Sequence, residues 1–221
     1  MWRDAIRGIE PSGTISGMPV AKGAALDPGR TRADMLRAAT DLLYQRGLDG
    51  IGVAELCTTM GVSKETLYRH FRSKEGLVQA VLDARSGRIM EWVHRAVEAA
   101  GDDPHAQLAA VFDALAQWHE EPAFRGCAIL NAATQQHEGP ARLTAHRHLD
   151  RQLEVLAGIA RRAGARDPAA LARQLLALRV GATVLADLHA DAEAAALAKQ
   201  AALALLSAAA NPAGGSGSAT A

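Results

Sequence analysis

The residues best suited to recognition chemistry open a short amphipathic segment in the first third of the chain. Lys64 can donate hydrogen bonds to guanine O6 or N7, and the methyl group of Thr66 can pack on thymine. Glu65 can accept from cytosine N4 or simply favour the start of a helix, and its type leaves both interpretations open. This combination of side chains suits the major groove of double-stranded DNA.

Two short helices across residues 52–71 are expected to position these side chains. Gly61 can adopt the positive φ that a tight turn needs, and Ser63 is a good N-cap for the helix that follows. The apolar positions recur at helical spacing: Val53, Leu56, Met60, Leu67 and Phe71. The pattern predicts a helix-turn-helix whose second helix can enter a major groove.

The segment Gly61–Leu77, GVSKETLYRHFRSKEGL, resembles the amino-terminal domain of the TetR (tetracycline-repressor-like) transcription factors. The resemblance is dense across roughly residues 31–82. It departs at Gly52, where the family usually has a Thr or Ser cap, and at Cys57, where it usually has alanine. Glycine is a tolerable N-cap and cysteine is a small apolar residue, so neither departure alters the interpretation.

The resemblance also implies contacts to the DNA backbone. Tyr68 and His70 resemble the pair that contacts phosphate in the family, and Lys74 matches a phosphate-contacting lysine at the start of the next helix. Arg69 and Arg72 are interpreted as a solvated face. The residues expected at the DNA are Thr31, Arg32, Ser63, Lys64, Glu65, Thr66, Tyr68, His70 and Lys74.

The charge of the chain is unevenly distributed although its formal net charge is zero. Residues 30–74 carry eight lysines and arginines against five aspartates and glutamates, whereas residues 75–221 carry thirteen against sixteen. The basic part is the part that contains the turn, as a surface facing phosphates requires. The excess is small, so we expect binding to depend on two copies of the module in a dimer.

Composition predicts an all-α fold, because alanine and leucine dominate and β-branched runs are absent. Two domains are expected, a DNA-binding domain over 30–90 and a ligand-binding and dimerisation domain over 91–210, between a disordered arm at 1–29 and a flexible tail at 211–221. Helices are expected at 32–46, 74–99, 105–120, 123–136, 140–163, 168–189 and 191–209.

Cellular context is inferred from the same composition. The two cysteines, Cys57 and Cys127, fall in different expected domains, so a structural disulfide is not expected and a reducing cytosol fits. We expect no membrane span, because no stretch approaches about 20 apolar residues. A cytoplasmic protein is therefore expected.

The second half of the chain is expected to hold a small-molecule effector. The run from Arg125 to Ala133 resembles a helix that lines the ligand cavity in one TetR-type regulatory domain. Phe112 and Trp118 can equally be ordinary core. The ligand-binding candidates are Trp92, Phe112, Trp118, Phe124, Cys127 and Asn131.

Other chemistries receive less support from the residues. Cys127 could act as a redox sensor, although only Arg125 nearby would clearly lower the pKa of its thiol. His137, His146 and His148 lack a further ligand at convincing spacing, so no metal or other cofactor is expected.

The last two expected helices carry broad stripes of small and branched apolar residues. Such stripes suit a homodimer held by residues 168–209 through a four-helix bundle, and they equally suit intramolecular core. The stripes comprise Leu171, Leu175, Leu178, Ala182, Leu185, Leu197, Ala201, Ala204 and Leu205.

No phosphate loop, nucleophile elbow, metal motif or kinase signature is present, so an enzyme is not expected. The leading hypothesis is a ligand-responsive repressor that leaves a palindromic operator when its effector binds. The alternatives are redox sensing through Cys127 and a DNA-binding protein without an effector.

Overall fold

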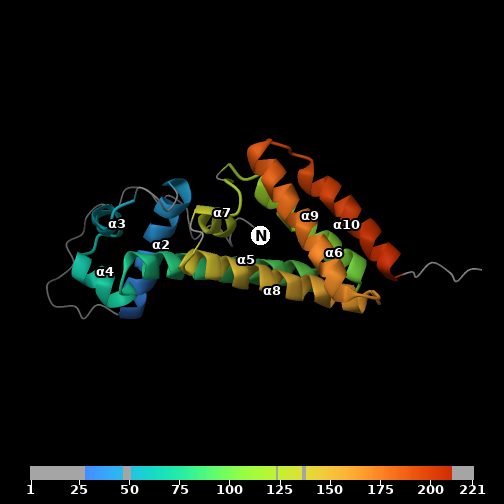
Figure 1. Ribbon diagram of the computed structural model, residues 1–221, viewed down its shortest axis with the longest axis horizontal. Helices are drawn as coiled ribbons and strands as arrows, with labels where there is room; N and C mark the ends of the chain where they lie inside the picture. Colours follow the sequence, from blue (N-terminus) through green and yellow to red (C-terminus); the bar gives the residue numbers. More distant parts are fainter. Residues whose placement is uncertain (1–27, 47–50, 123, 136–137, 211–221) are drawn as a thin grey trace, which may run out of the picture. The chain divides into compact units, whose positions relative to one another are not determined.

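The computed structural model describes residues 28–46, 51–122, 124–135 and 138–210, and every regular element within these ranges is an α-helix (Figure 1). The predicted all-α fold class is confirmed. The first helices are α2 (Pro28–Arg46), α3 (Val53–Met60), α4 (Lys64–Phe71) and α5 (Lys74–Ala99). They are followed by α6 (Pro104–His119), α7 (Ala128–Gln135), α8 (Pro140–Arg162), α9 (Pro168–Leu188) and α10 (Ala194–Ala210).

Three helix predictions differ from the structure at their first turns, and one of them, the helix predicted from residue 191, begins only at Ala194. Helix α2 begins at Pro28 and includes the last two residues of the arm predicted over 1–29, whose remainder lies outside the described residues, as does the tail at 211–221. The helix predicted from residue 123 begins only at Ala128. The chain turns before it, because the Phe124 amide donates to the Glu121 carbonyl at 2.8 Å and Gly126 takes a φ of 67°.

The chain divides into two compact units that are both discontinuous in sequence. The first comprises residues up to Arg88 together with Ala128–Ala145, and the second comprises Ile89–Cys127 and the residues from His146 onward. Helices α5 and α8 therefore each contribute residues to both units. The functional division predicted at residue 90 stays a prediction, and the compact units add that residues 128–145 group with the first unit.

The first unit is built around large apolar side chains contributed by each of its first four helices. Met35 of α2, Leu56 of α3, Leu67 of α4 and Leu77 of α5 are fully buried. Burying a side chain of this size stabilises a fold by about 1.5–3 kcal/mol. This core fixes the orientation of α4, whose polar side chains are candidates for DNA contact.

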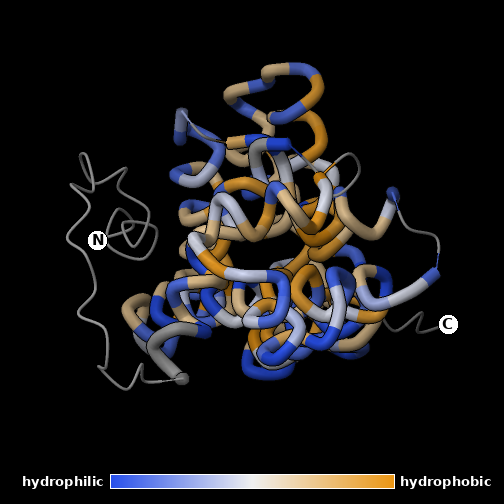
Figure 2. Tube along the Cα trace, turned by 90° about the vertical axis from the view of Figure 1, so that its left-hand side faces the viewer, coloured by the Kyte–Doolittle hydropathy of each residue, from blue (hydrophilic) through white to orange (hydrophobic). Residues whose placement is uncertain are grey.

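Helices α6, α9 and α10 of the second unit pack against one another (Figure 1). Hydrophobic and hydrophilic positions alternate along the helices (Figure 2), as expected where one face is buried. The fully buried positions include Leu108 and Leu115 on α6, Leu175 on α9, and Ala202 and Leu206 on α10. Alanine allows α10 to approach its neighbours closely.

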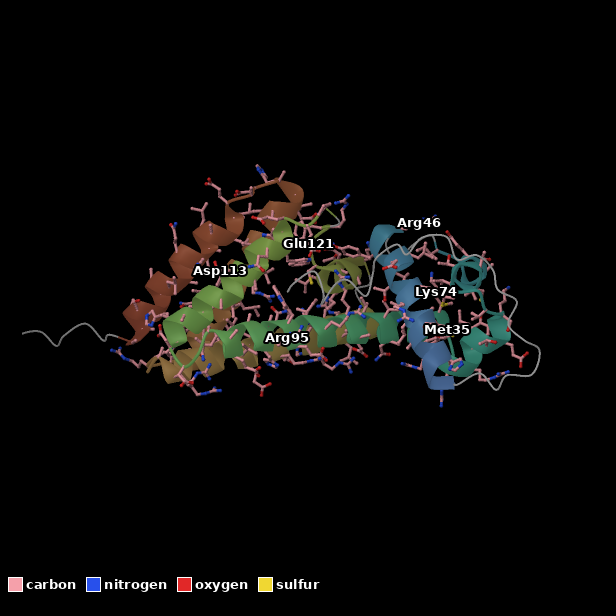
Figure 3. All side chains as sticks on the ribbon, turned by 180° about the vertical axis from the view of Figure 1, so that it is seen from behind. Met35, Arg46, Lys74, Arg95, Asp113 and Glu121 are labelled. Carbon is pink, nitrogen blue, oxygen red and sulfur yellow. The ribbon has the colours of Figure 1, made fainter. Side chains whose placement is uncertain are left out.

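Polar contacts tie the outer helices of the second unit to α6. Lys199 of α10 donates to Asp113 of α6 at 2.6 Å, and Asp113 is labelled in Figure 3. Arg162 of α8 donates twice to the Gln107 side-chain oxygen, from Nε at 3.1 Å and from a terminal nitrogen at 2.5 Å. These bonds orient α8 and α10 about the shared helix.

Helix α9 corrects the expectation that no segment resembles a membrane span. Its 21 residues are long and apolar enough to cross a membrane by length and composition. A core helix of a water-soluble protein passes the same test. Leu171, Leu175 and Ala182 of α9 are buried inside the second unit, whereas Val184, Leu185 and Leu188 are exposed, so packing within the single chain accounts for part of its apolar character.

The connection from α4 to α5 is tight and depends on a glycine. Arg72 takes a left-handed φ of 68°, and its amide donates to the Tyr68 carbonyl at 2.9 Å. The Ser73 hydroxyl then accepts from the Gly76 amide at 3.0 Å. A methyl group on Gly76 would lie 2.1 Å from the Phe71 carbonyl oxygen, which is closer than atoms can approach. Residue 76 must therefore be glycine for α5 to begin against the end of α4.

We expect Gly76→Ala to lower the free energy of unfolding by about 1–3 kcal/mol or more, because α4 and α5 must separate to admit the methyl group. Gly87→Ala is the matched control on the same helix, since a side chain there meets nothing within 4 Å. The control should raise stability by about 0.5–1 kcal/mol. Urea unfolding followed by circular dichroism measures both, and equal stability of the two variants would contradict the close approach.

Candidate nucleic-acid interface

The turn between α3 and α4 has the geometry that the sequence predicted. Gly61 takes a φ of 65°, so the expected positive φ is confirmed. Its amide donates to the Thr58 carbonyl at 3.2 Å, and the Val62 amide donates to the Cys57 carbonyl at 3.0 Å. These two bonds close the end of α3 and direct the chain into the next helix.

The start of α4 is capped by Ser63, as predicted. The Ser63 hydroxyl oxygen accepts from the Thr66 amide at 3.1 Å and lies 3.0 Å from the Thr66 hydroxyl. Such a cap stabilises a helix by about 1 kcal/mol. The Thr66 hydroxyl is already hydrogen-bonded to Ser63. The group of Thr66 that could contact the edge of a base is therefore its methyl group.

Helix α4 buries one face and exposes chemically unsatisfied groups on the rest. Leu67 and Phe71 are buried, whereas Lys64 is exposed and Tyr68 is 43% exposed. Within the part of the chain that the structure describes, neither the Lys64 ammonium nor the Tyr68 hydroxyl has a hydrogen-bond partner. Both groups are free to donate to an external acceptor such as a base or a phosphate oxygen.

Glu65 forms an ion pair along the same helix. Its carboxylate accepts from Arg69 at 2.9 Å, and both side chains are largely exposed. An exposed pair at this spacing contributes about 0.3–0.5 kcal/mol to a helix. The pair supports the interpretation of Arg69 as solvated surface. Because it is weak, the Glu65 carboxylate can exchange Arg69 for a cytosine amino group.

Two of the predicted backbone contacts lie together near the end of α4. The Arg32 guanidinium of α2 lies 5.1 Å from the centre of the Phe71 ring. A groove of about 490 Å³ is lined by Arg32, His70 and Gln79 among other residues. The Arg32 guanidinium and the His70 imidazole thus lie on one surface, where both could contact phosphates of a DNA backbone. The side chain of Thr31 lies outside the described residues.

Lys74 is the first residue of α5, where the predicted anion site lies (Figure 3). The amides of this first turn are already engaged. Ser73 accepts from Gly76, and hydrogen bonds from the Glu75 amide and the Ser73 hydroxyl lower the pKa of the Glu75 carboxyl. A phosphate here would therefore meet the Lys74 ammonium more readily than the helix amides.

The comparisons with known proteins agree with this geometry. The family model for bacterial regulatory proteins of the tetR family matches residues 35–81, which run from α2 into α5. A solved TetR-type transcriptional regulator from Streptomyces avermitilis is 33% identical to this chain, with a TM-score of 0.70. The alignment covers 81% of this chain and 97% of that one. The chain belongs to the TetR family.

Other TetR-family proteins match this chain to different extents. A solved regulator from Streptomyces coelicolor is 27% identical, with a TM-score of 0.72, over 83% of this chain and 97% of its own. The transcriptional activator FasR of Mycolicibacterium smegmatis is 33% identical over 90 residues. That match spans only 41% of each chain, less than half of the curated relative.

The effector candidates of this TetR-family protein divide between the two units. Trp118 and Phe124 make an edge-to-face ring contact with centroids 4.9 Å apart. Phe112 is fully buried, as the core interpretation expects, and Trp92 is also buried. Asn131 is exposed and belongs to the first unit, so the structure does not group it with the aromatic candidates.

The structure gives the burial of the two cysteines and the neighbours of the described histidines, which the sequence could not. Cys57 is buried, Cys127 is half-buried, and both thiols are free. His146 lies 3.0 Å from the Asp150 carboxylate, and His148 lies 2.6 Å from the Gln152 amide nitrogen. His137 lies outside the described residues, and redox sensing by Cys127 stays a prediction.

A buried polar cluster in the second unit was not predicted from the sequence. Arg179 of α9 donates to the Gln152 side-chain oxygen, and its charge contributes to the lowered pKa of His119. A signal for it was present, because Arg179 follows Leu171 and Leu175 at helical spacing and so falls on the buried face. The stripe predicted along this helix contains small and branched apolar residues alone.

Lys64 and Lys74 are predicted to contribute differently to DNA binding. Lys64→Ala should cost about 1–3 kcal/mol on the specific operator and change base preference, because it removes a contact to a base edge. Lys74→Ala should weaken binding to all DNA about equally and reduce the salt slope by about one unit. Titrations of both variants on operator and scrambled DNA measure this. Identical specificity ratios for the two variants would contradict the assignment.

His119 is predicted to make stability depend on pH. Burial, and then the charge of Arg179, lower the pKa of its imidazole from 6.5 to about 4. The unfolded chain then binds more protons between these values, so the free energy of unfolding falls as pH falls from about 6.5 to about 4, by at most about 3 kcal/mol. His119→Phe should flatten this dependence in urea unfolding. His146→Gln, at an exposed position, is the control that should preserve it.

Proposed function

We propose that this protein is a dimeric, ligand-responsive transcriptional repressor that reads a palindromic operator with α4. The observation that carries the proposal is the exposed Lys64 ammonium and Tyr68 hydroxyl on α4, which lack a partner among the described residues, within a TetR-type helix-turn-helix. Lys64 and Thr66 read base edges, while Tyr68, His70 and Lys74 bind phosphate oxygens and fix the register. Such a regulator acts in the cytoplasm.

Dimerisation is supported by an apolar surface on the last two helices. Leu171, Leu175 and Ala182 are buried within the unit, whereas Leu185 and its neighbours on α9 and α10 stay open to solvent in the single chain. The most exposed of these large apolar side chains are Val184, Leu185, Leu188 and Leu197. Large apolar side chains left exposed on neighbouring helices are candidates for an interaction site. A second copy pairing through α9 and α10 covers it and forms the four-helix bundle.

Release of DNA is attributed to a small molecule bound in the second unit. Helix α5 supplies residues to both units, so a ligand that favours one setting of it changes the separation of the two α4 helices in the dimer. That separation must be about 34–36 Å for successive major grooves. A ligand shifts it only by its differential affinity for the two settings. Trp92 lies on α5 within the second unit and is suited to sense the ligand.

Leu185→Glu tests this proposal. Leu185 is 47% exposed in the single chain, so the variant should fold, whereas a carboxylate buried without a partner in the dimer costs several kcal/mol. Analytical ultracentrifugation should show a monomer. The affinity of the variant for the palindrome should fall to about its affinity for DNA that carries a single half-site. Leu143→Glu is the matched control, because Leu143 is 55% exposed but lies outside α9 and α10. A Leu185→Glu protein that remains an intact dimer would rule out this interface.

A further inference from the structure

Arg179 is a buried cation without an anionic partner. It is 7% exposed, and among the described residues no carboxylate pairs with it. Within the described ranges, its guanidinium donates to the neutral side-chain oxygen of Gln152, and its Nε is buried without a partner. Burying an uncompensated charge costs several kcal/mol, so a fold retains such a group only when something offsets that cost.

The neighbours of Arg179 provide polarity but no fixed negative charge. Gln152 also lies 2.6 Å from the His148 ring, so its amide is held between an arginine and a histidine. Burial and the neighbouring guanidinium lower the pKa of His119 to about 4, so its imidazole is neutral near pH 7. The His119 Nε2 is likewise buried without a partner in the part of the chain that the structure describes. Cys127 is the group whose ionised form would favour the charge on Arg179.

Aromatic surface adjoins these polar groups. The ring of Phe124 lies 4.9 Å from the His119 ring and 4.9 Å from the Trp118 ring, centre to centre. All of these residues belong to the second unit. Among the described residues, the Nε of one guanidinium and one imidazole nitrogen thus lack partners beside a cluster of aromatic rings, and a flat, negatively charged molecule can use groups of both kinds.

We infer that this cluster binds an aromatic carboxylate, with Arg179 as its ion-pair partner, His119 as a hydrogen-bonding group, and Trp118 and Phe124 as its apolar wall. The Nε edge of a guanidinium forms the fork that takes a carboxylate through two parallel hydrogen bonds. The inference rests on the proposed ligand response and names the chemical class of the ligand.

Two probes of equal shape test the inference without any mutation. Naphthalene carboxylate and naphthalene carboxamide share the ring and differ in charge, and calorimetry or quenching of tryptophan fluorescence reports their binding. The protein should bind the carboxylate at least about tenfold more tightly, because only the carboxylate forms the charge-assisted pair. Equal affinity for the two probes, or no binding of the carboxylate, overturns the inference.

Variants of α9 then assign the preference to one residue. Arg179→Met should abolish the preference and raise the melting temperature of the unliganded protein, because it removes an unpaired buried charge. Arg173→Met, at an exposed position on the same helix, should retain the preference. An Arg179→Met protein that still prefers the carboxylate overturns the assignment. If Arg179→Met fails to fold, Arg179 serves the fold and its assignment to the ligand is overturned. The assignment is also overturned if the Arg173→Met control loses the preference for the carboxylate to the same extent.

Operator binding separates this inference from the proposed function. Carboxylate binding that also releases the operator supports both. If the protein binds the carboxylate but stays on the operator, the result supports the anionic site and contradicts the proposal that ligand binding releases DNA. Release of the operator by the carboxamide alone keeps the ligand response and overturns the anionic site.

Discussion

The close approach of α5 to the end of α4 is the constraint on which the proposed recognition surface depends. Gly76 lies against the Phe71 carbonyl, Ser73 caps the new helix, and Arg72 adopts a left-handed backbone conformation that costs a residue with a side chain about 1–3 kcal/mol. The apolar contacts of Leu67 and Phe71 must offset that cost. As a result, the proposed recognition helix α4 is tied to the first turn of α5, and α5 also contributes residues to the second unit. A signal carried by α5 can therefore reach α4 without passing through a flexible loop.

Local chemistry explains why this part of the protein was predictable. Gly61 and Ser63 act through their own backbone and side chain, so their turn and cap follow from residue type. Gly76 could not be recognised in the same way, because its role depends on a carbonyl five residues away across a turn. Arg179 was missed because an apolar stripe reveals which face is buried but not whether a buried charge finds a partner. The helix expected from residue 123 failed at Gly126, whose positive φ interrupts it.

The two candidate sites use positive charge in opposite ways. Lys64 is exposed, and its charge remains hydrated until a base or phosphate replaces water. Arg179 has already lost its hydration in the folded chain, and burial lowers the pKa of its guanidinium. The cost of desolvating Arg179 is therefore incurred when the protein folds. An anionic ligand that binds later gains the interaction with the guanidinium without incurring that cost again. Salt should weaken contacts of the first kind far more than the second, because exposed charges are screened and buried ones are not.

In the proposed function, two copies of α4 read one palindrome at a fixed separation. To test this directly, an operator is selected from random DNA, and about five base pairs, half a helical turn, are then inserted between its half-sites. We expect the insertion to lower affinity nearly to that of a single half-site, because the second α4 then faces the wrong side of the duplex, and we expect about ten inserted base pairs not to restore it. Unchanged affinity for the operator with the half-turn insertion would show that the two α4 helices do not read the half-sites together.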